Sequence, residues 1–243
     1  EEAAGLIEVE YEPLPAVFDP EEAMKNTDIL VHPDMDKYQH SPAFSPQPGT
    51  NIANHFKLRK GDVKSAFEKA DFIVEGIYSM PQVSHSYMEP ITTIAHYRAD
   101  GSIFVQSSCQ SPFTVQYLLS VTFGVPLHKI RVIAPFVGGG FGGKAGLNFE
   151  PLVVLVSKKA NYRPVKLCLS REENFYSAPI RVGLVAKIRT AVTNEGFILG
   201  EEIEYILDSG ACADYAVNVG RAAGYAAIGP YDTVSYTHLR AHE

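Results

Sequence analysis

Residues 137–144 read Val-Gly-Gly-Gly-Phe-Gly-Gly-Lys, so five glycines surround a single phenylalanine. Each glycine inside a regular helix or strand costs roughly 0.5–1 kcal/mol relative to alanine. Such a run is therefore expected where the backbone adopts positive φ angles or lies against a ligand. A strand-like run precedes it at 129–136, and a helix-like run follows it at 148–160. A strand, a glycine loop and a helix in this order can direct backbone N–H groups at an anion.

Two phosphate-binding patterns match this loop incompletely. Gly138, Gly140 and Gly143 satisfy G-x-G-x-x-G, which a run this rich in glycine meets by chance. Gly143 and Lys144 also complete G-x-x-x-x-G-K, but Ala145 stands where a Ser or Thr would hold Mg²⁺. The pattern argues against an ordinary nucleoside triphosphatase. A phosphate-bearing cofactor site, a dinucleotide-binding module and a purely structural turn all stay open.

Further motifs accompany the loop in a fixed order along the chain. They are Gly-Asp-Val-Lys-Ser-Ala-Phe (61–67), His-Ser-Tyr-Met-Glu-Pro (85–90), Ser-Ser-Cys-Gln-Ser-Pro-Phe (107–113), Arg-Val-Ile-Ala-Pro (131–135), Glu-Pro (150–151), Arg-Pro-Val-Lys (163–166), Ser-Arg-Glu-Glu (170–173), Asp-Ser-Gly-Ala (208–211) and Gly-Pro-Tyr (229–231). This series resembles the molybdenum-cofactor-binding subunit of the xanthine dehydrogenase/aldehyde oxidase family. The resemblance runs from about Glu1 to about Asp232, and several ordered motifs are more specific than any single one.

The resemblance implies a molybdenum–pyranopterin cofactor, in a mono- or dinucleotide form. Members of the family oxidise an aldehyde or a purine-like N-heterocycle with oxygen derived from water. Electrons then leave through iron–sulfur and FAD groups on partner domains or chains, in an assembly that we expect to be dimeric. The family's glutamate base lies downstream of the residues present here. We therefore expect no catalytic residue in this chain and no activity of the chain alone.

The same resemblance assigns cofactor contacts to six residues: Gln110, Gly140, Phe141, Gly142, Gly143 and Arg221. A fixed N–H at Phe141 or Gly142 would donate a hydrogen bond to an oxo group and polarise it. The amide of Gln110 can both donate and accept, which suits a pterin edge. The structural alternatives are a core aromatic for Phe141 and a turn-capping side chain for Gln110.

On the substrate side, the resemblance points to Arg181, which in purine-hydroxylating members stabilises negative charge that develops on the substrate. For Arg181 and Arg221 alike, the alternative is a surface salt bridge. His85 and Glu89 would border the active site. Alternatively, these two form a hydrogen-bonded pair that holds the end of a strand.

Two positions depart from the family's pattern. Val83 stands where many members have a metal-facing Gln, and Gln82 is one residue earlier. Ala145 replaces the glutamate that purine-specific members place after the lysine, although Glu150 is not far along the chain. These departures slightly favour a non-catalytic relative that has lost the cofactor, whereas the intact glycine loop disfavours it.

The composition limits the number of domains, the kinds of partner and the kinds of metal site that the chain can have. The chain has 243 residues, of which 46% are hydrophobic and 20% charged, enough for one large or two small domains. It has no run of 18 apolar residues, and its net charge of −7 disfavours nucleic acid or an anionic membrane as a partner. Cys109, Cys168 and Cys212 form no C-x-x-C pair. We expect reduced thiols in a cytoplasmic protein, and no metal bound directly by side chains.

The organisation along the chain follows from the motifs. We expect 1–16, with a strand at 5–11, to end a preceding small α/β domain, and 17–60 to be a connecting segment. Residues 61–232 would form the N-terminal part of the molybdenum-cofactor-binding domain, and 233–243 a non-native tail. His238 and His242 in that tail could share one face of a helix, but no third metal ligand is near.

Hydrophobic periodicity predicts the elements in between. Helices are expected at 20–25, 61–70, 112–123 and 148–160. Strands are expected at 71–78, 92–97, 102–107, 129–136, 165–169, 182–193 and 197–208. Because strands and helices do not alternate strictly, the sequence predicts an α+β fold of mixed α/β layers.

Overall fold

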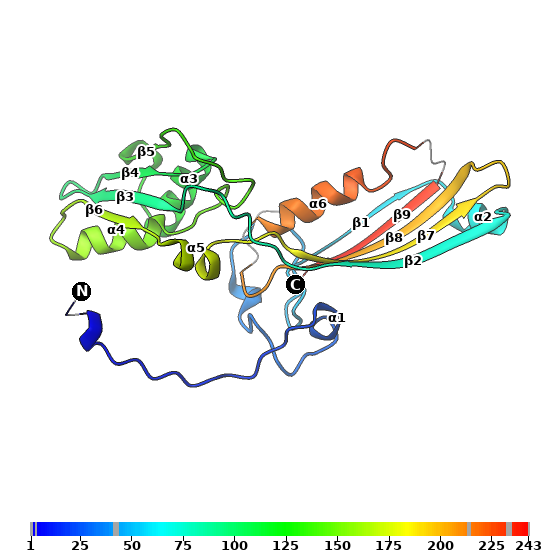
Figure 1. Cartoon of the computed structure of the whole chain (residues 1–243), viewed down its shortest axis with the longest axis horizontal. Coiled ribbons are helices and arrows are strands. Elements are labelled where there is room, and N and C mark those ends of the chain that lie inside the picture. Colours follow the sequence, from blue (N-terminus) through cyan, green and yellow to red (C-terminus); the bar gives the residue numbers. More distant parts are fainter. Residues whose placement is uncertain (1, 3, 41–43, 213–214, 232–234, 243) are drawn as a thin grey trace.

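The computed structural model describes residues 2, 4–40, 44–212, 215–231 and 235–242. Two sheets, each with its own helices, lie at opposite ends of the long axis of the molecule (Figure 1). The mixed α/β fold predicted from the sequence is confirmed. None of the described helices has the length and apolar character needed to cross a membrane.

The smaller sheet has four strands in the order β5-β4-β3-β6. The strands are β3 (Thr92–Tyr97), β4 (Ile103–Ser107), β5 (Ile130–Ile133) and β6 (Val165–Cys168). β3 pairs antiparallel with β4 and β6, and β4 pairs parallel with β5. Two helices, α3 (Pro112–Phe123) and α4 (Glu150–Lys159), pack against it. They enclose a core of Ala95, Ile103, Val105, Cys109, Val115, Leu119, Val125, Ile130, Val153 and Val154.

Local signals in the sequence account for these elements. The β3–β4 turn closes with a hydrogen bond from Arg98 N–H to Ser102 O (2.8 Å), and Gly101 has a φ of +79°. Helix α3 begins with Pro112, whose fixed φ suits the first turn, and ends at Gly124 in the left-handed region. These boundaries agree with those predicted from the sequence.

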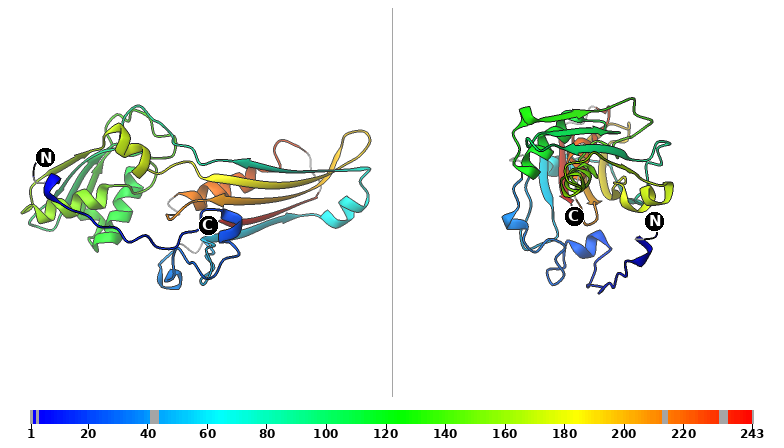
Figure 2. Two further views of the ribbon diagram at one scale, coloured as in Figure 1. Left: turned by 60° about the horizontal axis from the view of Figure 1, so that its bottom comes forward. Right: turned by 90° about the vertical axis from the view of Figure 1, so that its left-hand side faces the viewer.

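The larger sheet has five strands in the order β1-β9-β8-β7-β2. The strands are β1 (Asn54–Lys60), β2 (Phe72–Met80), β7 (Gly183–Val192), β8 (Ile198–Asp208) and β9 (Ser235–His242). Only β8 and β9 pair parallel among these neighbours. In Figure 1 and in the left view of Figure 2, α6 (Ala216–Ala226) lies near the end of the strands that faces the other sheet. Helix α2 (Val63–Glu68) lies at the far end.

Short elements complete the chain: η1 (Ala4–Leu6), α1 (Pro20–Ala23), η2 (Met35–Lys37), η3 (Leu127–Lys129) and α5 (Arg171–Ser177). The expected strand at 5–11 is wrong, since irregular backbone follows η1. β1 lies inside the range expected to be only a connection, and β9 inside the range expected to be a tail. His238 and His242 therefore lie on a strand rather than a helix, and the described residues contain no cluster of metal ligands.

Candidate functional site

The glycine loop at 137–144 follows β5 and owes its glycines to close contacts. A Cβ on Gly140 would lie 2.4 Å from Gln110 Oε1, and one on Gly143 would lie 2.8 Å from His85 Nδ1. Gly139 and Gly142 have φ angles of +97° and +98°, which side chains rarely tolerate. Larger residues at these positions would therefore displace either Gln110, His85 or the loop backbone.

Gln110 anchors this loop from the turn between β4 and α3. Its Oε1 accepts hydrogen bonds from the N–H groups of Gly142 (2.9 Å) and Lys144 (3.2 Å). Its own backbone N–H donates to Lys144 O (2.8 Å). Two donors on one atom identify it as the amide oxygen, so the NH₂ group remains for other partners. Gln110 thus holds a distant loop instead of capping a local turn.

Phe141 forms the exposed tip of the loop. Its φ is +52°, and 74% of the residue surface is exposed, so the interpretation as a core aromatic is wrong. The N–H of Gly142 is taken by Gln110. Within the described part of the chain, nothing accepts a hydrogen bond from the N–H groups of Gly140 and Phe141. Gly140 is buried, so the N–H of Phe141 is the donor that the exposed tip can offer to a ligand.

Lys144 and the following helix exclude the phosphate-loop interpretation. The Lys144 side chain is fully buried, and its Nζ lies 2.8 Å from Glu89 Oε2, so it cannot reach a phosphate. Helix α4 begins only at Glu150, whose own carboxylate accepts the Asn148 N–H (2.7 Å) beside the helix N-terminus. That carboxylate would repel a bound anion. The loop is therefore neither a triphosphatase loop nor a dinucleotide-binding turn.

Glu150 points into the four-stranded sheet and not toward the loop tip. It is 1% exposed, and Ser107 Oγ donates to its Oε1 (2.7 Å). Although it is close to Ala145 along the chain, it supplies no carboxylate to the cavity beside the loop. Its charge also acts on Cys109, where burial first, and then Glu150, raise the thiol pKa to about 11. Cys109 is therefore an unreactive core thiol.

A cavity of about 870 Å³ opens beside the loop tip. Its lining includes Gln82, His85, Phe141, Gly142, Gly143, Asn148, Arg181, Asp208, Ser209, Cys212 and Tyr215. The structure thus brings Phe141, Gly142, Gly143 and Arg181 together around one space. Gln110 and Gly140 support the loop from behind. Arg221 lies on α6, whose Ala216 and Val219 line the cavity while Arg221 does not.

His85 and Glu89 do not pair with each other. His85 Nδ1 lies 3.3 Å from Pro179 O, whereas Glu89 contacts Lys144. Val83 and Arg181 form an isolated backbone bridge, with N···O distances of 3.2 and 2.9 Å. Within the described chain, Arg181 makes no salt bridge, and its Nη2 donates to Pro81 O (3.2 Å). The surface-salt-bridge interpretation of Arg181 is therefore wrong.

Two residues that line the cavity were not predicted as site residues from the sequence. Asn148 Oδ1 and Ser209 Oγ are buried, and neither has a hydrogen-bond partner among the described residues. A buried polar atom without a partner costs free energy unless a ligand or water satisfies it. Ser209 lies in the Asp-Ser-Gly-Ala motif, which could have pointed to it, whereas Asn148 has no comparable signal. Both atoms fit a polar ligand that fills this space.

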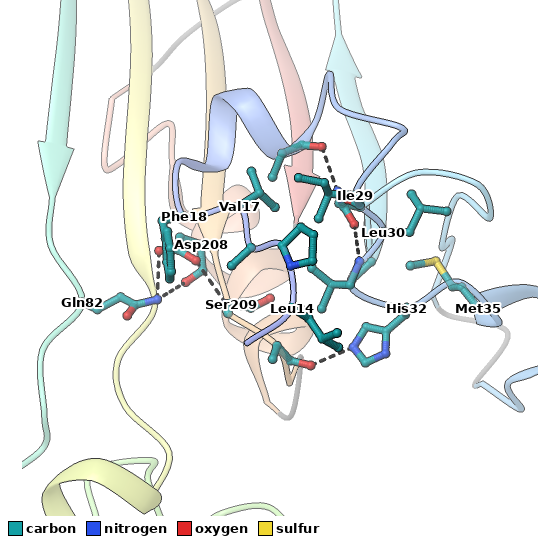
Figure 3. Close-up of a pocket in the computed structure, with 18 residues that line it drawn as sticks. Leu14, Val17, Phe18, Ile29, Leu30, His32, Met35, Gln82, Asp208 and Ser209 are labelled. Carbon is teal, nitrogen blue, oxygen red and sulfur yellow. Dashed lines mark hydrogen bonds between the residues drawn. The ribbon is translucent and has the colours of Figure 1, made fainter. Parts of the chain in front are cut away.

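A second cavity of about 530 Å³ adjoins the first (Figure 3). Segment 14–35 forms much of its wall, with Leu14, Val17, Ile29, Leu30 and Met35 among the apolar residues. Both cavities share Gln82, Asp208, Ser209 and Ala211. Gln82 Nε2 donates to Asp208 Oδ2 (2.9 Å), as Figure 3 shows, and this bond lies where the two spaces meet. Gln82 is therefore held by a carboxylate.

Residues 44–240 match the model of a protein family described as "Molybdopterin cofactor-binding domain". The chain is 29% identical over 238 residues to the putative xanthine dehydrogenase molybdenum-binding subunit XdhA of Escherichia coli (strain K12), covering 98% of this chain and 30% of that protein. It is 30% identical over 231 residues to the nicotinate dehydrogenase large molybdopterin subunit of Eubacterium barkeri, covering 95% of this chain and 51% of that protein. The chain thus spans between about a third and a half of the length of these two relatives.

Solved structures agree with this match. Reconstituted CO dehydrogenase from Oligotropha carboxidovorans superposes with a TM-score of 0.81 at 27% identity, covering 99% of this chain and 30% of that one. Aldehyde oxidoreductase from Desulfovibrio gigas superposes with a TM-score of 0.83 over 99% of this chain and 25% of that one. At 21% identity, the second likeness concerns the fold alone.

Proposed function

Because the chain belongs to the family of molybdopterin cofactor-binding domains, we propose that it forms part of the molybdenum site of a hydroxylase that oxidises an aldehyde or an N-heterocycle with water-derived oxygen. The loop at 137–144 carries this proposal. It presents an exposed phenyl ring and the N–H of Phe141 beside a cavity of about 870 Å³. Cavities of this volume with a few convergent polar groups are typical of cofactor sites.

The cofactor would be held mainly by uncharged polar groups of the chain. The N–H of Phe141 and the NH₂ of Gln110 are donors, while Asn148 Oδ1 and Ser209 Oγ can accept from a pterin edge. Arg221 of α6 would lie at the edge of the site. When bound, the cofactor supplies a metal centre that accepts two electrons from the substrate. Fixed N–H donors would stabilise negative charge there without any titration.

The substrate would lie between Phe141 and Arg181 in the same cavity. The ring of Phe141 offers a flat apolar surface to an aromatic substrate. The guanidinium of Arg181 is the charged donor suited to stabilise negative charge on the reacting molecule. Because Ala145 is small and buried, no carboxylate extends from that position into the cavity. We therefore place aldehydes and N-heterocycles of modest polarity ahead of purines.

The general base would come from other parts of the polypeptide. Among the described residues that line the cavity, Asp208 is a carboxylate, but it accepts hydrogen bonds from Gln82 Nε2 and from the Gly210 N–H. Both of its oxygens are therefore already engaged within this chain. We propose that this chain alone does not turn over substrate.

The organisation of the full assembly is part of the same proposal. Residues 61–232 would form the N-terminal part of the cofactor domain, after the end of a smaller domain at 1–16. Iron–sulfur and FAD groups on partner domains or chains would take the electrons, and the assembly would be a cytoplasmic dimer.

The test is to produce the complete gene product in a host that makes molybdopterin, and to measure bound molybdenum and pterin. Near-stoichiometric cofactor and incorporation of ¹⁸O from labelled water into an aromatic acid or lactam are expected. A folded product without molybdenum would identify a cofactor-free relative. Turnover by the 243-residue chain alone would contradict the missing base.

A further inference from the structure

The glycine loop is fastened at both ends by one charged pair that the cofactor would not touch. We propose that Glu89 and Lys144 are positioning residues that clamp the loop, and so fix the Phe141 tip in the conformation that receives the cofactor. The role given to the clamp, which is to hold the loop ready for the cofactor, rests on the proposed function. The clamp itself is a property of the chain, and it can be tested without any cofactor.

The carboxylate of Glu89 binds both ends of the loop at once. Its Oε2 accepts from Lys144 Nζ (2.8 Å) and from the Gly138 N–H (2.9 Å). Lys144 Nζ donates a second bond to the Glu89 carbonyl (2.8 Å), and the Glu89 N–H donates to Gly138 O (3.3 Å). The loop at 138–144 is therefore closed across a single residue of another segment. A Cβ on Gly138 would lie 2.7 Å from Glu89 Cβ, so the approach also requires glycine there.

Burial makes this pair hard to replace. Lys144 is fully buried, and its Nζ lies 4.5 Å from the centroid of the Tyr87 ring. An ammonium group without water depends on its carboxylate, so removal of one partner leaves an uncompensated buried charge. Burial alone would raise the pKa of Glu89, but the bonds from Lys144 and Gly138 outweigh it and hold that pKa below its usual value. The carboxylate is therefore charged at neutral pH.

Helix α5 fixes the segment that carries Glu89 from the other side. Arg171 Nη1 and Nη2 donate to the carbonyls of Tyr87 (2.8 Å) and Met88 (2.6 Å). Asn174 Oδ1 accepts the Ile91 N–H (3.1 Å). The helix is itself closed by a capping box that begins at Ser170. Helix α5 thus holds the backbone on both sides of Glu89, independently of the loop.

The loop tip explains why a clamp is needed. Phe141 is a bulky residue at a φ of +52°, a conformation that costs about 1–3 kcal/mol and persists only when its surroundings enforce it. Gln110 holds the loop backbone at Gly142 and at Lys144. Glu89 holds the two ends. Without the clamp, we expect Phe141 to relax toward negative φ and its N–H to lose its fixed direction.

A fluorescent reporter can test this in the 243-residue chain. The sequence contains no tryptophan, so Phe141→Trp places a single tryptophan at the tip. In that background we would compare Glu89→Gln, Lys144→Met and the double variant, with Lys158→Met as the matched control. Lys158 also lies over an aromatic ring, Tyr97 (4.9 Å), but it is exposed and on α4. The readouts are tryptophan anisotropy, acrylamide quenching and the unfolding midpoint.

Each single clamp variant should lower the anisotropy and raise the quenching constant about twofold or more, while Lys158→Met should leave both unchanged. The double variant removes both charges, so it should recover unfolding midpoint relative to the singles but keep the mobile tip. Unchanged tip anisotropy in a folded double variant would overturn the proposal. Recovery of the anisotropy together with the midpoint would also overturn it, because the pair would then serve stability alone.

A second measurement covers variants of the chain that do not fold. In the complete gene product, chymotryptic cleavage after residue 141 is followed by mass spectrometry in the original Phe141 background. We expect cleavage about tenfold faster in Glu89→Gln and Lys144→Met than in Lys158→Met. Equal rates would refute the clamp. Neither experiment depends on molybdenum, so a failure of the cofactor assignment would leave these results in place.

Discussion

The two sheets of the molecule differ in whether a buried carboxylate beside them has hydrogen-bond partners. Glu150, beside the four-stranded sheet, is 1% exposed and accepts hydrogen bonds from Ser107 Oγ and the Asn148 N–H. Glu201, on β8 of the five-stranded sheet, is 8% exposed, and its Oε2 has no partner among the described residues. Burial raises the pKa of Glu201. The buried carboxylate of the smaller sheet is thus satisfied by hydrogen bonds, whereas that of the larger sheet has an oxygen without a partner among the described residues.

Apolar side chains show the same difference. Ile103 and Val105 of β4 are buried in the core of the smaller sheet. The edge strand β2 of the larger sheet leaves Phe72, Ile73, Val74, Ile77, Tyr78 and Met80 exposed. The region that carries the candidate site is therefore packed by this chain itself, which is what a rigid loop requires.

The largest effect on stability is expected when the same substitution, isoleucine to alanine, is made in each of the two sheets. Ile103→Ala should destabilise the chain by about 2–5 kcal/mol, because a fully buried side chain leaves a cavity. Ile77→Ala, on the exposed strand β2, should change the stability by less than about 0.5 kcal/mol. Urea unfolding of both variants measures the difference. Similar losses would show that β2 is covered in solution.

Glu201→Gln should stabilise the chain by about 1 kcal/mol at pH 7, because Glu201 Oε2 is buried without a partner among the described residues. The native pKa of Glu201 is raised, so the native state holds its proton to higher pH than the unfolded chain does. Its contribution to stability therefore falls as the pH rises through that window. Thermal unfolding from pH 4 to pH 8 should show this slope in the wild type and its loss in the variant. A less stable variant at pH 7 would mean that Glu201 has a partner.

Glu89 should show a pH dependence of the opposite sign. Its pKa is lowered in the native state, so its contribution is complete above the unfolded value of about 4.3 and is lost as the pH falls through the native value. The stability difference between the wild type and Glu89→Gln should thus shrink in acid. Unfolding midpoints between pH 3 and pH 7 test this. A gap that widens in acid would contradict the charge pair with Lys144.

Much of the fold could be predicted because its signals are local. Pro112 and Gly124 delimit α3, and Arg98 to Gly101 form the expected turn. β1 was missed because its partner β9 lies far along the chain, although Phe56 and Leu58 alternate with polar residues as in a strand. The segment at 5–11 has the alternation of a strand, but no neighbour among the described residues pairs with it. Strand formation depends on such non-local pairing.

The site was predictable only in part. The motifs pointed to the loop, to Gln110 and to Arg181, and the structure brings Phe141 and Arg181 to one cavity. The partners of Glu89 could not be read from the sequence, since Lys144 looked like a phosphate ligand and His85 like the nearer partner. Only the tertiary arrangement shows that the lysine is fully buried.

The most direct test of the cofactor site is the molybdenum retained by Gly140→Ala relative to Gly5→Ala in the complete gene product. The methyl group at position 140 would lie 2.4 Å from Gln110 Oε1, whereas the one at position 5 meets nothing within 4 Å. We predict that Gly5→Ala keeps the wild-type molybdenum content and that Gly140→Ala loses most of it while remaining folded. Equal molybdenum content in two folded variants would contradict the assignment of the glycine loop to the cofactor.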